Sequence, residues 1–282
     1  MRDFCLHILE AGDLESKLAL PEPGVFDRPP DPENAPRPPM RPKRTGGLEM
    51  RGGVEPLPKP HELQTPEARA RCLARFAHHE LMAVEMFAWA ILRWPALPDR
   101  IERGLLGVLQ DEQRHCRLYL DRLAAHGSKL EDHVLSDYFW KHVAAISDSA
   151  AGPAAFFSAM GLTVEQGNHA FAPRYSDAFR EAGDTTSAAV CEQIHLDEIE
   201  HVRFAAGALR ELSESAESST DIELYERAAP FPLSAARAKG RRFDADARRQ
   251  AGLSEEFIEY VRSARPPQKA RSHPRPAPGR LE

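Results

Sequence analysis

A five-residue pattern, Asp-Glu-x-x-His, occurs twice in this chain of 282 residues, at residues 111–115 and again at residues 197–201. On an α-helix, residues three positions apart lie one turn from each other on the same face. The glutamate and the histidine of each copy can therefore both face one metal ion. Two copies constrain the fold more than one, because both must lie on helices whose faces meet.

A lone glutamate precedes each copy by about the length of a helical hairpin. Glu80 lies 32 residues before Glu112, and Glu165 lies 33 residues before Glu198. One Glu from each of two helices, with Glu-x-x-His from each of the other two, is the ligand rule of di-iron and di-manganese four-helix bundles. We therefore expect two Fe ions, or a Mn/Fe pair, per chain. The predicted ligands are Glu80, Glu112, His115, Glu165, Glu198 and His201.

Capping signals predict a first helical hairpin. Thr65 is suited to cap a helix with Pro66 at its first position, and prolines after Trp94 end that helix. Asp99 is then expected to cap a second helix that ends at Gly127.

A second hairpin is predicted after a long crossover at residues 127–152. Its first helix should begin near Pro153 and end at Gly183, and Asp184 should cap a fourth helix that ends near residue 213. Two hairpins joined by one long connection make a ferritin-like topology. We therefore predict an all-α fold in which residues 63–217 form a ferritin-like di-metal four-helix bundle.

The N-terminal residues 1–62 are predicted to be a short helix followed by an extended arm. Residues 4–20 have the pattern of one amphipathic helix, and 12 of the 40 residues at 21–60 are proline, which forbids continuous helix. The arm also has a basic cluster, which we interpret as part of a solvated linker rather than as a nucleic-acid contact. Its members are Arg37, Arg41, Lys43, Arg44 and Arg51.

Two further segments follow the predicted bundle. Residues 218–265 contain amphipathic pieces, including a last helix capped by Ser254, and we expect them to pack on the bundle. Residues 266–282 are rich in Pro, Arg and Lys and are expected to be a disordered tail.

Competing ligands can be excluded by their height along the helices. With the first turn centred near residues 96 and 97, Glu80 is level with residue 113, whereas Glu85 is level with about residue 108, on the order of 7 Å away. In the second hairpin, Glu192 and His195 should lie more than about 10 Å away from the level of Glu165, measured along the helix axes. All three are therefore predicted to lie outside the site.

An aspartate precedes the glutamate of each copy. A metal-bound histidine normally donates its other ring N–H to a carboxylate or a carbonyl. In a bundle with two-fold pseudo-symmetry, Asp111 can reach His201 and Asp197 can reach His115. The alternative is that both aspartates are ordinary surface acids.

Other polar residues near the predicted site have simpler interpretations. Tyr119 is expected to be a core tyrosine with a hydrogen-bonded hydroxyl, and His78 and His79 to be core or edge histidines. His169 is also expected to be a core histidine, although its place one turn after Glu165 would let it touch the site. Small inward residues are expected to leave room for oxygen or a substrate; these are Ala83, Gly161 and Ala205.

Charge and cysteine content narrow the function. The net charge of −6 and the pI near 6.1 give no overall basic surface for a polynucleotide. The four cysteines are scattered without a Cys-x-x-Cys pair, which disfavours a zinc ribbon, a rubredoxin-type site or a disulfide framework. No apolar run reaches 18 residues. We therefore expect a cytoplasmic, soluble protein with reduced thiols and no membrane partner.

The doubled motif resembles the oxygen-activating branch of the ferritin-like di-metal carboxylate superfamily, which includes bacterial multicomponent hydroxylases and acyl carrier protein desaturases. Three segments look like an uncharacterised bacterial ferritin-like family, a domain of unknown function: HHELMAVE at 78–85, DYFW at 137–140 and ARRQAG at 247–252. That resemblance covers most of residues 5–262. It implies the fold and the metal site but no substrate, and some members of neighbouring families are tRNA hydroxylases.

Three hypotheses for function follow. The first is an oxidoreductase, a hydroxylase or oxidase, that uses dioxygen or peroxide on a small-molecule or modified-RNA substrate, with an electron-donor protein and a homodimer as candidate partners. The second is a ferroxidase or a metal storage or sequestration protein. The third is a metal-free helical scaffold, in which the acidic cluster would be a buried polar network that takes up protons. Four carboxylates and two neutral imidazoles carry a charge of about −4, which two divalent cations cancel.

Overall fold

The structure is a computed structural model that describes residues 1–21, 35–51, 56–213 and 219–266. Throughout these ranges the regular elements are all helical, and the only β-type pairing is an isolated bridge between Met50 and Leu135. The prediction of an all-α chain is therefore confirmed. None of the helices in these ranges is both long enough and apolar enough to cross a membrane.

The first long hairpin consists of α3 (Pro66–Arg93) and α4 (Asp99–Ala125). The Thr65 hydroxyl accepts a hydrogen bond from the N–H of Ala68 at 3.2 Å, as its capping role requires. The expected cap at Asp99 is wrong: Pro98 is the extended residue before α4, and Asp99 is already helical. The carbonyl of Pro98 accepts the first N–H bonds, so Asp99 instead places a negative charge in the positive first turn. Gly127 ends the helix at a φ of 71°.

The second long hairpin pairs a composite helix with α8 (Thr185–Leu212). The composite helix runs through α6 (Pro153–Phe156), η4 (Phe157–Glu165) and α7 (Gln166–Glu181). Asp184 caps α8 through a hydrogen bond from the N–H of Ser187 at 3.0 Å. Segment η4 is a π-helix, which the sequence did not predict. Its wider turn places the Thr163 hydroxyl 2.8 Å from the carbonyl of Ser158, five residues earlier.

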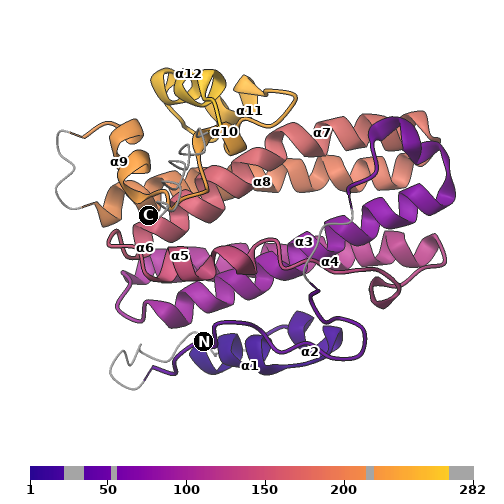
Figure 1. The fold of residues 1–282 in the computed structure, drawn as a ribbon, viewed down its shortest axis with the longest axis horizontal. Helices are drawn as coiled ribbons and strands as arrows, with labels where there is room; N and C mark the ends of the chain where they lie inside the picture. Colours follow the sequence, from indigo (N-terminus) through magenta and orange to yellow (C-terminus); the bar gives the residue numbers. More distant parts are fainter. Residues whose placement is uncertain (22–34, 52–55, 214–218, 267–282) are drawn as a thin grey trace, which may run out of the picture.

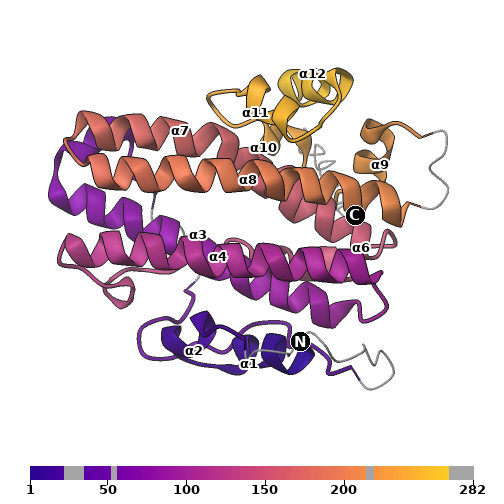
Figure 2. The ribbon, with the colours of Figure 1, turned by 180° about the vertical axis from the view of Figure 1, so that it is seen from behind.

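The two hairpins pack against each other along α4 and α8, with α3 beside α4 and α7 beside α8. Figures 1 and 2 show two groups of outer helices on opposite sides of this pair of hairpins: α1 and α2 lie against the α3–α4 hairpin, and α10 to α12 lie over the α7–α8 hairpin. Four cysteines are buried as free thiols within the apolar core. The two hairpins therefore enclose an interior between them, and the outer helices lie on either side of it.

The N-terminal segment differs from the single helix expected at residues 4–20. It forms α1 (Arg2–Glu10) and a separate short helix α2 (Leu14–Leu18). The chain breaks because the Asp13 carboxylate accepts the N–H of Ser16 at 2.8 Å and so begins a new helix. Helix α1 buries Cys5, Ile8 and Leu9 against α3.

The Pro-rich arm is not only a solvated linker, and this expectation is wrong for Arg44. Arg44 is buried and binds Glu85 of α3 with two hydrogen bonds, Nε to Oε1 at 3.0 Å and Nη2 to Oε2 at 2.7 Å. Lys17 contacts the same carboxylate at 2.9 Å, and the Trp140 indole N–H donates to it at 3.0 Å. The arm is therefore attached to the hairpin by a buried ionic cluster, although Arg37, Arg41, Lys43 and Arg51 are exposed as expected.

Short helices make up the connections. The arm contains η1 (Pro60–Gln64), and the crossover contains η2 (Leu130–Asp132), η3 (Trp140–His142) and α5 (Val143–Ser147). The C-terminal segment forms α9 (Asp221–Ala228), α10 (Ala235–Ala238), α11 (Ala245–Gln250) and α12 (Glu255–Ser263). Ser254 caps α12 by accepting the N–H of Phe257 at 3.2 Å. The tail expected to be disordered lies, from residue 267 on, outside the described residues.

Candidate metal centre

Six buried side chains from four helical segments meet between the two hairpins. Glu80 comes from α3, the first Glu-x-x-His from α4, Glu165 from the end of η4, and the second Glu-x-x-His from α8. They form two groups of four, and within each group one donor atom per residue lies within 4.8 Å of the others. Both groups contain Glu112 and Glu198. The first group is Glu80, Glu112, His115 and Glu198, and the second is Glu112, Glu165, Glu198 and His201.

The π-helical turns of η4 precede Glu165 and bring its helix close to α8. A Cβ atom added to Gly161 would lie 2.1 Å from the Cβ of Ala205, so only glycine allows this approach. The expectation that Gly161 and Ala205 leave open space is therefore wrong, because they fill the space between their two helices. Ala83 is also buried and does not line the cavity described below.

Each histidine has one ring nitrogen facing the carboxylates and one facing outward. Nδ1 of His115 lies 3.3 Å from Oε2 of Glu112, and its Nε2 lies 3.0 Å from Oδ2 of Asp197. Nδ1 of His201 lies 3.2 Å from Oε1 of Glu112, and its Nε2 lies 3.3 Å from Oδ2 of Asp111. Each aspartate thus contacts the histidine of the other Asp-Glu-x-x-His copy. These contacts would fix the imidazole orientation that a metal ligand requires.

Sequence reasoning missed two polar residues that hold this arrangement. Arg114 bridges the two outer aspartates, with Nη2 2.6 Å from Asp111 and Nη1 3.0 Å from Asp197. Asn168 donates a hydrogen bond from Nδ2 to Oε1 of Glu198 at 3.2 Å. Arg114 stands inside the motif and Asn168 lies on an inward helical position, but Asp197 and Glu198, their partners on α8, come from another helix.

Burial and crowding shift the pKa values of the carboxyl groups apart. Burial, together with the neighbouring carboxylates, raises the pKa of Glu80 and Glu165 well above the ordinary value, and it also raises the pKa of Glu198. Burial alone would raise the pKa of Glu112 too, but hydrogen bonds from His115 and His201 lower it strongly. Three of the four acids therefore favour protonation when no cation is present.

The pKa values of both histidines are also raised, although burial alone would lower them. Burial opposes a charge on His115, but its hydrogen bonds to Asp197 and Glu112 outweigh burial and raise its pKa to about 9. Burial likewise opposes a charge on His201, and the carboxylates around it raise its pKa well above the ordinary value. Two buried imidazoles that attract positive charge indicate a negative field strong enough to hold a cation.

Several oxygen atoms in the cluster are buried without a hydrogen-bond partner among the described residues. They include Oε1 of Glu165 and Oε2 of Glu198. Buried polar atoms are nearly always paired, so buried carboxylate oxygens without a partner in one cluster are suited to bind a cation. Carboxylate and imidazole ligands suit iron, manganese or zinc. The buried cluster could therefore hold metal ions.

Glu85, Glu192 and His195, which were predicted to lie outside the site, belong to neither group. Glu85 is bound by Arg44 and Lys17, and Glu192 binds Arg180 and accepts a hydrogen bond from Ser176 at 2.9 Å. His195 lies beside Asp244 instead, with its Nε2 at 3.9 Å from Oδ2.

The other singled-out aromatic residues also stand outside the two groups. The His169 ring packs edge-on against His195 with ring centroids 5.6 Å apart, and burial lowers the His169 pKa to about 3. The Tyr119 hydroxyl donates to Sγ of Cys191 at 3.8 Å, as expected for a core tyrosine. His78 lies with Nε2 2.7 Å from the Ser136 carbonyl, so it is a core residue.

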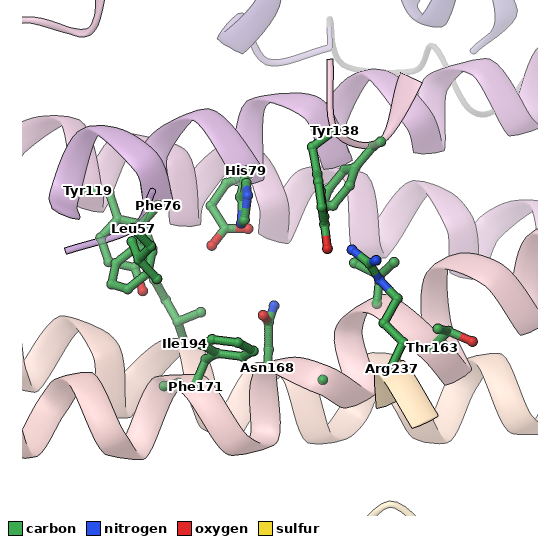
Figure 3. A pocket seen from close by; sticks show the side chains of 15 residues that line it. Leu57, Phe76, His79, Tyr119, Tyr138, Thr163, Asn168, Phe171, Ile194 and Arg237 are labelled. Atoms are coloured by element: carbon green, nitrogen blue, oxygen red, sulfur yellow. The ribbon is translucent and has the colours of Figure 1, made fainter. Parts of the chain in front are cut away.

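A cavity of about 130 Å³ lies beside the cluster and includes Glu80 in its wall. Figure 3 shows its lining, with Phe76 and Tyr119 at one end, His79 and Asn168 across from each other in the middle, and Tyr138 at the other end. Most of the wall is apolar or aromatic. A small molecule in this cavity would therefore contact one of the candidate ligands directly.

Residues 9–259 match the family described as "Protein of unknown function (DUF455)". The chain belongs to this family. The match covers the two hairpins, the arm and most of the C-terminal helices, but the family description gives no activity. No curated protein and no solved structure matches the chain.

Proposed function

We propose that this member of the DUF455 family is a ferritin-like di-metal carboxylate protein, in which α3, α4, the α6–α7 composite helix and α8 form the four-helix bundle. The observation that carries the proposal is the pair of four-residue groups that share Glu112 and Glu198. Two ions in such groups would both be held by Glu112 and Glu198.

In this proposal Glu80 and His115 complete the site of the first ion, and Glu165 and His201 complete the site of the second. Bound iron, or a manganese and iron pair, would supply the ability to react with dioxygen or peroxide. Asp197 and Asp111 would orient the two imidazoles and increase their basicity through the contacts at 3.0 and 3.3 Å.

We further propose that the protein is an oxidoreductase, a hydroxylase or oxidase, that acts on an organic substrate in the cavity beside Glu80. Aromatic side chains such as Phe76 and Phe171 line that cavity and would exclude water from the reacting carbon. A storage site needs a route for hydrated iron, which this apolar wall does not favour. The cavity therefore favours the enzyme over the ferroxidase or storage hypothesis.

The test combines elemental analysis of protein purified from its own host with anaerobic Fe(II) titration followed by exposure to oxygen. We expect about two metal ions per chain and an oxygen-dependent absorption change. Glu198→Gln should abolish both, whereas Glu192→Gln, a change at an exposed position on the same helix, should leave both intact. Absence of metal, or equal behaviour of the two variants, would rule out the di-metal assignment. Accumulation of many iron atoms per chain would favour storage instead.

A further inference from the structure

Four residues from outside the long helices close the cavity beside Glu80. Leu57 comes from the arm, Tyr138 and Phe139 from the crossover, and Arg237 from α10. The C-terminal segment is held close to the hairpin at Gly240, where φ is 62° and an added Cβ would lie 2.2 Å from the Cβ of Ala170. The segments that flank the hairpins therefore shape the cavity in which a substrate would bind.

Arg237 is the cationic side chain in this wall, and it has an incomplete set of partners. Its guanidinium carbon lies 4.4 Å from the centroid of the Tyr138 ring, and Figure 3 shows the two side chains meeting at one end of the cavity. Its Nη2 atom is buried without a hydrogen-bond partner, and no carboxylate of the described residues forms an ion pair with it.

A buried arginine of this chain shows what a complete set of partners looks like. Arg44 binds both oxygens of Glu85, with Nε on one and Nη2 on the other. A guanidinium taken out of water needs such acceptors, because its lost hydration is otherwise uncompensated. Because Arg237 has no acceptor for its buried Nη2 and lines a cavity, its missing acceptor should be a group of the bound molecule.

We propose that the cavity binds a small organic carboxylate, with its carboxylate on Arg237 and its hydrocarbon part extending past Glu80 toward Phe76 and Phe171. This proposal rests on the proposed function, because it names the substrate class of the same site. A guanidinium offers two parallel N–H donors, which match the two oxygens of a carboxylate. The aromatic ring of Tyr138 beneath the guanidinium keeps its plane fixed for that contact.

Shape and size agree with this orientation. In Figure 3, Arg237 and Tyr138 lie at one end, Leu57, Phe76 and Tyr119 at the other, and His79 and Asn168 between them. Glu80 follows His79 on α3, and Asn168 contacts Glu198, so the middle of the cavity faces the candidate metal centre. The volume of about 130 Å³ is close to the ~150 Å³ of an engineered cavity that accepts benzene. A single ring or a short chain with one carboxylate therefore fits, and a folded RNA does not.

The test compares benzoate with benzamide, its neutral isostere, by calorimetry on the full chain with and without bound metal. We expect wild type to bind benzoate more tightly than benzamide. Arg237→Gln should weaken benzoate binding by about 10- to 100-fold, the usual effect of losing a charged hydrogen-bonding partner, and should change benzamide binding little. Arg237→Lys keeps the charge but loses the paired donors, so its benzoate affinity should lie between those of wild type and Arg237→Gln. Arg241→Gln, at an exposed position nearby, is the matched control.

Equal benzoate affinity in wild type and Arg237→Gln would overturn the proposal, and so would a preference for benzamide. Phenyl phosphate is the third probe, and a clear preference for it over benzoate would overturn the carboxylate assignment in favour of a phosphate ester. Failure of the proposed function is distinguishable, because a protein that binds no metal can still bind benzoate through Arg237. Conversely, a wild-type protein that binds metal but does not bind benzoate would reject only the substrate class.

Discussion

Helix α3 carries two buried glutamates five residues apart, and they have opposite surroundings. Glu85 is enclosed by Arg44 and Lys17, with a further hydrogen bond from Trp140. Glu80 lies with the carboxylates of Glu112 and Glu198, and no Lys or Arg side chain of the described residues forms an ion pair with it. Burial raises the pKa of both, but the two cations reverse the effect at Glu85 and leave its pKa below the ordinary value. Glu85, which is paired with cations of its own chain, stabilises the fold. Glu80, which has no such partner among the described residues, could bind an external cation.

The pentapeptide at residues 111–115 contacts both the candidate metal centre and the N-terminal segment that carries Lys17. Glu112 and His115 face the candidate metal centre, and Asp111 and Arg114 form the outer contacts of the imidazoles. Gln113 points the other way and donates to the carbonyls of Lys17 and Ala19, both at 3.0 Å. The motif therefore also holds the N-terminal segment whose lysine binds Glu85.

The largest expected effect is on folding. Glu85→Gln leaves Arg44 and Lys17 buried without a counter-charge, so we expect a loss of about 3–5 kcal/mol in the free energy of unfolding. Glu80→Gln in the same metal-free protein should lose far less or gain stability, because it removes one of several like charges. Urea denaturation of both variants makes the comparison, and equal losses would contradict the distinction between the two glutamates.

A second prediction concerns metal affinity and uses two histidines of α8. His201→Ala removes a candidate ligand, so metal affinity should fall by more than the about 10- to 100-fold that follows loss of an outer partner. His195→Ala should retain metal, because His195 lies beside Asp244. Elemental analysis after dialysis against a weak chelator gives the result. Similar metal loss in both variants would show that the metal centre is elsewhere.

The third prediction tests the outer contacts. Asp197→Asn keeps the size of the side chain and removes its charge, so the His115 imidazole loses its preferred tautomer and basicity. We expect metal affinity or activity to fall by about 10- to 100-fold with helix content unchanged. Glu200→Gln, at an exposed position three residues later, is the control. Fe(II) titration under anaerobic conditions would contradict the role of Asp197 if the two variants behaved alike.

The smallest expected effect is a difference in pH dependence, measured on metal-free protein. The raised pKa of Glu80 means that its contribution to stability is present below its unfolded pKa and is lost as the pH rises through its folded pKa. Relative to Glu80→Gln, wild type should therefore lose stability as the pH rises above 4.5, by at most about 1.4 kcal/mol per pH unit.

The same measurement on Glu85 should show a loss of stability only on the acid side. Its lowered pKa means that its contribution is present above the unfolded pKa of 4.5 and is lost only as the pH falls through the folded value. The difference between wild type and Glu85→Gln should therefore stay constant from pH 5 to 8. A slope of the same sign for both residues would contradict the separation of the two environments.

Local signals in the sequence predicted the helices well. Thr65, Gly127, Asp184 and Ser254 act as expected because a cap depends on backbone groups within a few residues. The predicted cap at Asp99 was wrong by one residue, because Pro98 has the extended conformation that precedes the helix. The π-helix at residues 157–165 was not predicted, since the close approach of Gly161 to Ala205 depends on the neighbouring helix.

The sequence by itself also determined which acids and histidines can share a helix face, because the spacing of three residues follows from helical geometry. Only the tertiary structure decided the cation partners of Glu85, the bridging position of Arg114 and the placement of Arg237 in the cavity wall. The physical reason is the distance along the chain. Arg44 lies 41 residues from Glu85, and Arg114 lies 83 residues from Asp197. No local pattern encodes such contacts, which form only when separate segments pack together and exclude water.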